Sequence, residues 1–309
     1  MARCFVTREL PGPALDRLRE RHEVDVWPER LPPPYEQLRA RTMPAHGLLC
    51  LLTDRVDAGL IAAAPQLRAI ANYAVGYDNI DLEAAGARDI QLGNTPDVLT
   101  DATADLTFTL LLAAARRLPD ALASARDGDW VTWEPSAHLG HDVNGATLGI
   151  VGMGRIGSAV ARRARGFDMT VLHTGRDGGL PLPELLAQAD FVSLHAPLTP
   201  ATHHLIDAAA LDAMKPSAIL INTARGPLVD QRALIDALSA GQIAGAALDV
   251  TDPEPPPPGD PLLSAPNLIV APHIGSATHT AREAMATLAV DNLLAALDGR
   301  PMPHPVPVS

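Results

Sequence analysis

Short apolar runs alternate, in the first third of the chain, with stretches in which apolar residues recur at helical spacing. The strands predicted there are Cys4–Thr7, Val24–Trp27, Gly47–Leu52, Leu67–Tyr73 and Ile90–Gly93. The helices predicted between them are Pro13–Arg21, Tyr35–Thr42, Ala58–Ala64 and Leu82–Arg88. Short apolar strands that alternate with helices predict a parallel sheet covered by helices.

A second series with the same rhythm begins at Thr147–Gly152. Its later strands are predicted at Thr170–Thr174, Phe191–His195, Ala218–Thr223, Ala244–Val250 and Asn267–Ala271. Its helices are predicted at Ile156–Arg165, Pro183–Ala189, Asp207–Met214 and Gln231–Ala240. A last helix, from about Thr280 to Leu297, follows the final strand and is free to pack back on the first series. The pattern predicts two α/β units, each built on its own parallel sheet.

Between the two series lies a long apolar helix, predicted from Thr100 to Leu118. Asp101 falls in its first turn and Arg116 and Arg117 in its last, where their charges suit the helix dipole. The stretch Asp127–Asn144 that follows has no regular pattern. A loop of that length is usually functional or part of an interface.

The composition is that of a folded protein with more than one domain. A chain of 309 residues corresponds to about two domains, and 47% hydrophobic with 19% charged residues excludes a disordered chain. The net charge of −12 argues against a general nucleic-acid binder, which needs a basic surface. A few local arginines must therefore hold any anionic substrate.

The two cysteines, Cys4 and Cys50, lie in apolar runs and cannot build a disulfide framework. The start of the chain has no secretion-signal pattern, and no apolar run approaches the length of about 18 residues expected for a membrane span. These features predict a soluble cytoplasmic protein with no membrane partner.

A glycine-rich turn follows the first strand of the second series. Gly152, Gly154 and Gly157 have the G-x-G-x-x-G spacing, with Arg155 and Ile156 between them, and a helix follows. Glycines at this spacing allow a tight turn, close approach to a pyrophosphate and close helix–strand packing. The helix start then presents amides and a positive dipole end to the phosphates. The context predicts a dinucleotide-binding turn.

The tip of the next strand bears on the choice between NAD(H) and NADP(H). An acidic residue there binds the ribose 2′-hydroxyl of NAD, but this strand ends in Thr174-Gly175-Arg176. Gly175 removes the repelling carboxylate, and Arg176 can pair with a 2′-phosphate. NADP(H) is therefore expected as the preferred cofactor, with NAD(H) possible. In the alternative, Arg176 is solvated and Asp177 accepts the 2′-hydroxyl.

Three polar residues follow three later strands of the second series: Arg225, Glu254 and His273. Because the carboxyl ends of parallel strands meet at one edge of a sheet, these side chains can converge. Arginine can bind the carboxylate and the carbonyl oxygen of a 2-oxo acid with its planar fork. Histidine, with an ordinary pKa of about 6.5, can donate a proton near neutrality, and a carboxylate partner orients its ring.

These motifs resemble those of the D-isomer-specific 2-hydroxyacid dehydrogenase family, and most closely its glyoxylate/hydroxypyruvate reductase branch. The family pattern is a glycine turn, then N-x-x-R-G, then L-D-V-x-x-x-E-P, then P-H-x-G, and all four occur here. Asp105 departs from the pattern, because the family usually carries Glu there, and we interpret that position as structural.

The resemblance implies two Rossmann-like or flavodoxin-like parallel-sheet domains, with the dinucleotide-binding domain inserted into the substrate domain. Residues 1–96 with 281–309 would form the flavodoxin-like substrate domain, and residues 97–280 the NAD(P)-binding domain.

The resemblance also implies roles for further residues. Val75, Gly76 and Ser276 would bind substrate, the first two through backbone amides. Asp249 would bind the nicotinamide carboxamide, and Thr103, Pro197, Thr223 and Gly275 would lie beside the cofactor.

A homodimer is expected on the same basis, and it leaves two roles open for Trp133. Its indole either reaches the substrate site of the neighbouring subunit or is buried in the dimer interface.

Two histidine pairs, His138 with His141 and His203 with His204, raise the question of a metal-binding site. Neither has cysteine or carboxylate partners at ligand spacing, so no metal site is predicted. His195 ends a strand and is expected to shape a crevice wall rather than to take part in catalysis.

The predicted activity is reduction of glyoxylate and hydroxypyruvate to glycolate and D-glycerate with NADPH, with His273 as general acid. Two alternatives stay open. The first is a reductase of another 2-oxo acid, such as 2-ketogluconate. The second is a non-enzymatic, nicotinamide-sensing scaffold of the corepressor type.

Overall fold

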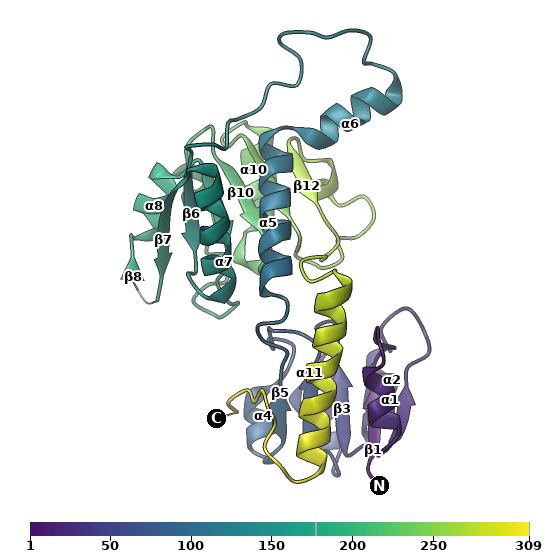
Figure 1. The fold of residues 1–309 in the computed structure, drawn as a ribbon. Coiled ribbons are helices and arrows are strands. Elements are labelled where there is room, and N and C mark those ends of the chain that lie inside the picture. The colour runs from purple at the N-terminus through teal and green to yellow at the C-terminus, as the bar shows by residue number, and fades with distance from the viewer. Residues whose placement is uncertain (177, 309) are drawn as a thin grey trace. The chain divides into compact units, whose positions relative to one another are not determined.

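The computed structural model describes residues 1–176 and 178–308, and the chain divides into two compact units (Figure 1). Unit 1 comprises Met1–Leu99 together with the residues from Ala277 onward, and unit 2 comprises Thr100–Ser276. These limits lie a few residues from the boundaries expected from the sequence. The predicted fold class, two parallel-sheet α/β units with one inserted into the other, is confirmed.

Unit 1 is built on a five-stranded sheet in which every pairing is parallel. Its strands are β1 (Arg3–Val6), β2 (Glu23–Val26), β3 (Gly47–Cys50), β4 (Ala69–Asn72) and β5 (Gln91–Gly93). Their order in the sheet is β2-β1-β3-β4-β5, which is the flavodoxin order. All five strands were predicted. β1 and β2 have the predicted length and begin one residue earlier, and β3, β4 and β5 are shorter than their predicted runs.

Helices cover both faces of this sheet. They are α1 (Ala14–Arg19), α2 (Tyr35–Thr42), α3 (Ala58–Ala63), α4 (Leu82–Gly86) and α11 (His279–Leu297). The last helix packs against β3, β4 and α1, as predicted. Gly47 permits this close approach, because a Cβ there would lie 2.8 Å from Leu293 Cδ1. Side chains of α2, α3 and α4 form a buried core with alternate residues of the strands on the other face, including Leu48 and Ile70.

Unit 2 contains a seven-stranded sheet. Its strands are β6 (Thr147–Val151), β7 (Thr170–Gly175), β8 (Gly178–Gly179), β9 (Phe191–Leu194), β10 (Ile219–Asn222), β11 (Gly245–Leu248) and β12 (Leu268–Val270). The order is β12-β11-β10-β9-β6-β7-β8, and only the pairing of β8 is antiparallel. The strand order reverses between β6 and β9, which is where such sheets bind ligands.

The helices of unit 2 also lie in two groups. On one face, α5 (Thr100–Ala115) and α7 (Arg155–Ala164) pack on each other and on the sheet. On the other face, α8 (Leu182–Gln188), α9 (Ala208–Asp212) and α10 (Gln231–Ser239) share a second core. Short 3₁₀ turns occur at Arg165–Phe167, Gly226–Leu228 and Pro261–Ser264.

The connecting helix differs from the sequence prediction at its end. Helix α5 stops at Ala115, Arg117 adopts the left-handed conformation with φ 48°, and a separate helix α6 (Leu118–Asp127) begins. The cause is Pro119, which has no N–H to donate and whose ring would clash with the carbonyl of Ala115. That carbonyl accepts the amide of His141 instead, at 2.8 Å. Arg116 and Arg117 therefore do not lie in the last turn of α5, and the dipole argument for them was wrong.

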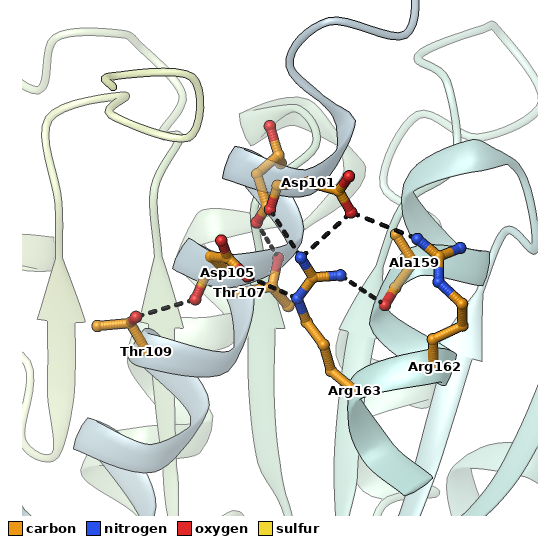
Figure 2. A network of polar contacts seen from close by, with 8 residues as sticks. Asp101, Asp105, Thr107, Thr109, Ala159, Arg162 and Arg163 are labelled. Carbon is orange, nitrogen blue, oxygen red and sulfur yellow. Dashed lines mark hydrogen bonds and ion pairs between the residues drawn. The ribbon is translucent and has the colours of Figure 1, made fainter. Parts of the chain in front are cut away.

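An ion-pair network joins α5 to α7, as Figure 2 shows. Arg163 Nε donates to Asp105 Oδ1 at 2.6 Å, and Arg163 Nη2 donates to Asp101 Oδ1 at 3.2 Å. Arg162 reaches the same Asp101 oxygen at 3.3 Å. Asp105 thus holds two helices together, which supports the structural interpretation of that position.

Candidate active site

The glycine-rich turn has the geometry of a dinucleotide cradle. Gly152 has φ 98°, and a Cβ there would lie 2.8 Å from the amide nitrogen of Ala196 on the far side of the sheet's switch point. A Cβ on Gly157 would lie 2.2 Å from the Gly152 carbonyl oxygen, so only glycine allows the helix to sit this close. At Gly154 nothing lies within 4 Å of a Cβ position, and no side chain caps α7. Open space beside an uncapped helix start fits a pyrophosphate.

The tip of β7 lies against this turn. The amide of Gly152 donates to the Thr174 carbonyl at 2.8 Å, and a Cβ on Gly175 would lie 3.8 Å from Gly152 Cα. Gly175 and Arg176 are exposed, and the chain returns as β8, which pairs with the end of β7. The tip therefore presents an arginine and no described carboxylate. Asp177, the alternative acceptor, lies outside the described residues.

Four residues predicted to lie beside the cofactor gather at the ends of neighbouring elements in unit 2. Asp249 follows β11, and its two carboxylate oxygens accept the amides of Ile274 and Gly275, each at 2.7 Å. A Cβ on Gly275 would lie 3.4 Å from the Thr103 methyl group. Thr107 links Thr103 to Thr223, because its hydroxyl donates to the Thr103 carbonyl and lies 2.9 Å from the Thr223 hydroxyl.

Asp249 is buried among these groups, and its environment shifts its titration. Burial raises the pKa of Asp249, and hydrogen bonds from the amides of Ile274 and Gly275 oppose that shift. The same residue's backbone carbonyl accepts the amide of His273 at 2.9 Å. Asp249 therefore supports the turn that carries the histidine.

The structure joins His273 directly to Glu254. His273 Nδ1 lies 2.5 Å from Glu254 Oε1, and both side chains are partly exposed. Glu254 Oε2 accepts the amide of Thr251 at 3.4 Å. His273 has φ 54°, a left-handed conformation that is costly for a residue other than glycine and that is common at functional sites. Because Nδ1 faces the carboxylate, Nε2 is the ring nitrogen that remains for a substrate.

Arg225 follows β10, the strand beside β11. Asn222 shapes its loop, because the Asn222 amide donates to the Arg225 carbonyl at 2.8 Å and its oxygen accepts the amide of Ala224 at 3.0 Å. A Cβ on Gly226 would lie 1.9 Å from the Thr251 carbonyl oxygen. The glycine therefore lets the arginine loop pack directly on the loop that leads to Glu254.

The loop predicted to bind the substrate carboxylate, Val75 and Gly76, lies in unit 1 after β4. Its carbonyl groups are held by side chains: Asn94 Nδ2 donates to the Val75 carbonyl and Asn72 Nδ2 donates to the Gly76 carbonyl, each at 2.8 Å. Within the described residues, neither the Val75 nor the Gly76 amide donates a hydrogen bond to another backbone group. We therefore expect the two amides to be available to an anion.

For the remaining predicted site residues the structure gives mainly their position in the chain. Arg155 and Ile156 open α7, Pro197 follows β9 with its carbonyl accepting the Thr202 hydroxyl at 2.7 Å, and Ser276 ends unit 2. Trp133 lies far along an irregular segment and is 81% exposed, so no site in its own chain encloses it.

His195 lies behind the cradle and is partly buried. Its Nε2 lies 2.8 Å from the Ser193 hydroxyl, and burial lowers its pKa from 6.5 to about 4. It is therefore neutral over the physiological range, in line with the structural role expected for it.

The described residues contain no group of three or more histidine, cysteine or acidic side chains arranged to hold a metal. His203 and His204 stack on each other with ring centroids 4.0 Å apart.

Sequence reasoning missed the asparagines that organise the substrate loop. Asn72 and Asn79 bond to each other, and Asn79 also donates to the carbonyls of Leu51 and Asp54. The available signal was an asparagine inside an apolar run, because a buried amide must find hydrogen-bond partners.

A family model for the D-isomer specific 2-hydroxyacid dehydrogenase NAD binding domain matches residues 108–275, which lie within unit 2. The glyoxylate reductase of Korarchaeum cryptofilum is 49% identical over 98% of this chain and 95% of that enzyme. The chain belongs to the D-isomer specific 2-hydroxyacid dehydrogenase family. The resemblance seen in the sequence motifs is thereby confirmed, including the glyoxylate reductase branch.

Solved structures are also similar to this chain over nearly its whole length. The TT0316 protein of Thermus thermophilus matches with a TM-score of 0.93 and 55% identity, over 99% of this chain and all of that chain. The NADPH-dependent glyoxylate/hydroxypyruvate reductase of Sinorhizobium meliloti, solved with NADP and malonate, matches with a TM-score of 0.87 and 35% identity, over 99% of this chain and 96% of that one.

As a member of this family, the chain is an NAD(P)-dependent dehydrogenase acting on a small molecule. No described helix combines the length and apolar character that a membrane crossing requires.

Proposed function

We propose that this enzyme reduces glyoxylate and hydroxypyruvate to glycolate and D-glycerate, with NADPH as the preferred cofactor. The observation that carries the proposal is the 2.5 Å contact between His273 and Glu254, at the carboxyl ends of β11 and β12 in the unit that holds the dinucleotide cradle. The named activities of the relatives from Korarchaeum and Sinorhizobium support the choice of substrate.

The residues would divide the reaction among them. When bound, the reduced nicotinamide supplies the hydride to the carbonyl carbon. The guanidinium of Arg225 binds the carboxylate and polarises the carbonyl oxygen, since its planar fork fits two oxygens at once. His273 donates the proton from Nε2 to that oxygen, and Glu254 accepts the Nδ1 hydrogen and fixes the orientation of the ring. In the reverse direction the same imidazole accepts the proton.

Other residues would bind rather than react. The amides of Val75 and Gly76 donate to the substrate carboxylate, and Ser276 contacts the substrate. Gly152, Gly154 and Gly157 hold the pyrophosphate at the start of α7, with Arg155 and Ile156 in its first turn. Asp249 accepts the nicotinamide carboxamide beside Thr103, Pro197, Thr223 and Gly275.

The preference for NADPH rests on the tip of β7. Gly175 leaves space for a 2′-phosphate, and the exposed Arg176 supplies a guanidinium beside Thr174. The Sinorhizobium enzyme, described as NADPH-dependent, supports this choice.

We also propose that the enzyme is a cytoplasmic homodimer. Helix α6 buries none of its residues, and the segment after it exposes Trp130, Val131 and Trp133. Exposed apolar groups of this size usually mark an interface.

The test measures the oxidation of NADPH by its absorbance, with the purified protein and one 2-oxo acid at a time: glyoxylate, hydroxypyruvate, pyruvate or 2-ketogluconate. The same four acids are then tested with NADH. The proposal predicts that glyoxylate or hydroxypyruvate gives the highest kcat/KM, and that NADPH is the better cofactor. A higher kcat/KM with 2-ketogluconate would replace the proposed substrate. Oxidation with none of the acids would favour the non-enzymatic scaffold.

A further inference from the structure

Unit 1 contains a cavity of about 740 Å³ that the proposed catalytic residues do not use. It is lined by segments that follow the first four strands and by the start of α11, and all of its lining residues belong to unit 1. Its volume falls within the range of about 300–1,000 Å³ that is typical of small-molecule sites.

The cavity lies at the switch point of the flavodoxin-like sheet. The strand order β2-β1-β3-β4-β5 reverses between β1 and β3. Residues that follow β1, from Arg8 to Pro11, and Leu51, which follows β3, both contribute to the lining. In open α/β sheets the crevice beyond the carboxyl ends of the strands at this reversal is where ligands bind.

The lining is rich in guanidinium groups. Arg8, Arg30 and Arg282 all contribute, and within the described residues none of them forms an ion pair with a carboxylate. Glu9 also lines the cavity, but its charge is engaged by Arg19 at 3.1 Å. Glu29 is the lining carboxylate that has no ion pair among the described residues.

The polar atoms of the aromatic lining residues Tyr73 and Trp27 already form hydrogen bonds within the protein. Tyr73 donates its hydroxyl hydrogen to the Arg282 carbonyl at 2.8 Å, and Trp27 Nε1 donates to the Leu31 carbonyl at 2.8 Å. Arg8 Nη1 donates to the Thr7 carbonyl at 2.6 Å, and the other guanidinium N–H groups of the lining are the main polar function left to a ligand. Burial lowers the pKa of Arg8, with the charge of Asp54 opposing the shift, so an anion beside Arg8 would offset a desolvation cost.

We propose that this cavity is a second ligand site, which binds the oxyanion group, carboxylate or phosphate, of a small metabolite through Arg8, Arg30 and Arg282. The planar fork of arginine matches both kinds of oxyanion. The rings of Trp27 and Tyr73 supply an apolar wall for the rest of the ligand. The cavity contains none of the residues assigned to hydride or proton transfer, and Tyr73 in its wall lies two residues before Val75 in the loop proposed to bind the substrate carboxylate.

The test is isothermal titration of the full chain with inorganic phosphate and, separately, with succinate, in the absence of a 2-oxo acid. At least one anion is expected to bind saturably, and comparison of the two identifies the preferred oxyanion. The same titration with NADPH present separates the cavity from the dinucleotide cradle. Binding that NADPH abolishes would assign the anion to the cradle and overturn the proposal. Binding that persists with NADPH excludes the cradle, and the arginine variants of the cavity then separate it from the proposed substrate site at Arg225.

Three variants and a control locate the binding. Arg30→Gln and Arg282→Gln are each expected to weaken it about tenfold or more, the effect of losing one charge-assisted hydrogen bond. Glu29→Gln is expected to strengthen it about two- to fivefold, because it removes a repelling charge. Arg39→Gln, which removes the charge of an exposed arginine on α2 outside the cavity, should leave it unchanged.

The Arg282→Gln variant is expected to fold. The backbone carbonyl of Arg282 holds Tyr73, so the Arg282→Gln change keeps that bond. The proposal is overturned if neither anion binds saturably, or if both arginine variants bind as tightly as the unchanged protein. Since binding is measured without turnover, this failure is separate from any failure of the proposed reductase activity.

Discussion

At some positions of the candidate site only glycine fits, because backbone atoms lie too close to leave room for a Cβ. Gly226 is the clearest case, because a Cβ there would lie 1.9 Å from the Thr251 carbonyl oxygen, an atom that cannot move aside as a side chain can. The arginine of the R-G pair needs the glycine after it, since that glycine lets the Arg225 loop pack on the loop leading to Glu254.

We therefore expect Gly226→Ala to lower the free energy of unfolding by about 1–3 kcal/mol, the range for overpacking, and to lower kcat/KM as the two loops separate. Gly166→Ala is the matched control, because nothing lies within 4 Å of its Cβ position. Its effect on stability should stay within about 0.5 kcal/mol. Denaturant unfolding and steady-state kinetics measure both, and equal stability of the two variants would contradict the packing argument.

The partly buried imidazole of His195 is expected to make the stability of the fold depend on pH. Burial lowers its pKa from 6.5 to about 4, so between these values the unfolded chain binds the additional proton. The contribution of neutral His195 to the free energy of unfolding is complete above pH 6.5 and is lost as the pH falls toward 4. Within this window the expected slope approaches about 1.4 kcal/mol per pH unit.

Replacing His195 by Gln removes this titration. The variant's unfolding free energy, measured by denaturant at a series of pH values, should fall less steeply between pH 6.5 and 4 than that of the unchanged protein. Parallel pH profiles would show that His195 is not the source of the acid sensitivity.

At the scale of elements, the pairing of α5 with α7 relies on charges as well as on apolar contact. Arg163 binds Asp101 and Asp105 across the two helices, but both carboxylates are well exposed, so the energy of each pair is small. Arg163→Ala should cost about 1 kcal/mol of stability, and Asp105→Glu should cost less because it keeps the carboxylate.

A double-mutant cycle between Arg163→Ala and Asp105→Ala measures the pair itself. The expected coupling is about 0.5 kcal/mol at low salt and less at high salt. The pair Arg232 with Asp236, which lies within α10, is the control, because its loss should not affect the contact between α5 and α7. A coupling of zero would mean that apolar packing alone joins these helices.

The elements show where sequence reasoning succeeds. All five strands of unit 1 were predicted because most of them are buried apolar runs between turn residues, as in Gly47–Cys50 and Ala69–Asn72. Strand β8 was missed because two glycines carry no hydrophobic pattern. The break between α5 and α6 was missed because the apolar pattern continues across it, and only the backbone constraint of Pro119 interrupts the helix.

The candidate site was predictable to the extent that parallel strands bring distant residues to one edge. This reasoning correctly anticipated that Glu254 and His273 meet. It could not anticipate that Asn72 and Asn94 donate hydrogen bonds to the carbonyls of the Val75–Gly76 loop. Those bonds depend on loop conformations, which the hydrophobic periodicity of the sequence does not describe.

At the scale of the whole molecule, the proposed homodimer would cover the exposed aromatic segment after α6. Trp133→Ala is expected to raise the KM for hydroxypyruvate several-fold if the indole reaches the partner's substrate site. Analytical ultracentrifugation must show that the variant is still a dimer. Trp130→Ala, a similarly exposed tryptophan three positions earlier, is the control. Unchanged kinetics in a dimeric Trp133 variant would leave that residue an interface role only.

In the proposed reaction, His273 is oriented by Glu254 and transfers the proton to the carbonyl oxygen of the 2-oxo acid. The most direct test is the kcat for glyoxylate reduction by His273→Asn, with the affinity for NADPH measured on the same sample by fluorescence. General acid catalysis contributes about 10²–10⁴-fold, so kcat should fall by that factor while the Kd for NADPH stays within about twofold. A variant that binds NADPH normally and keeps a kcat close to that of the unchanged enzyme would contradict the claim.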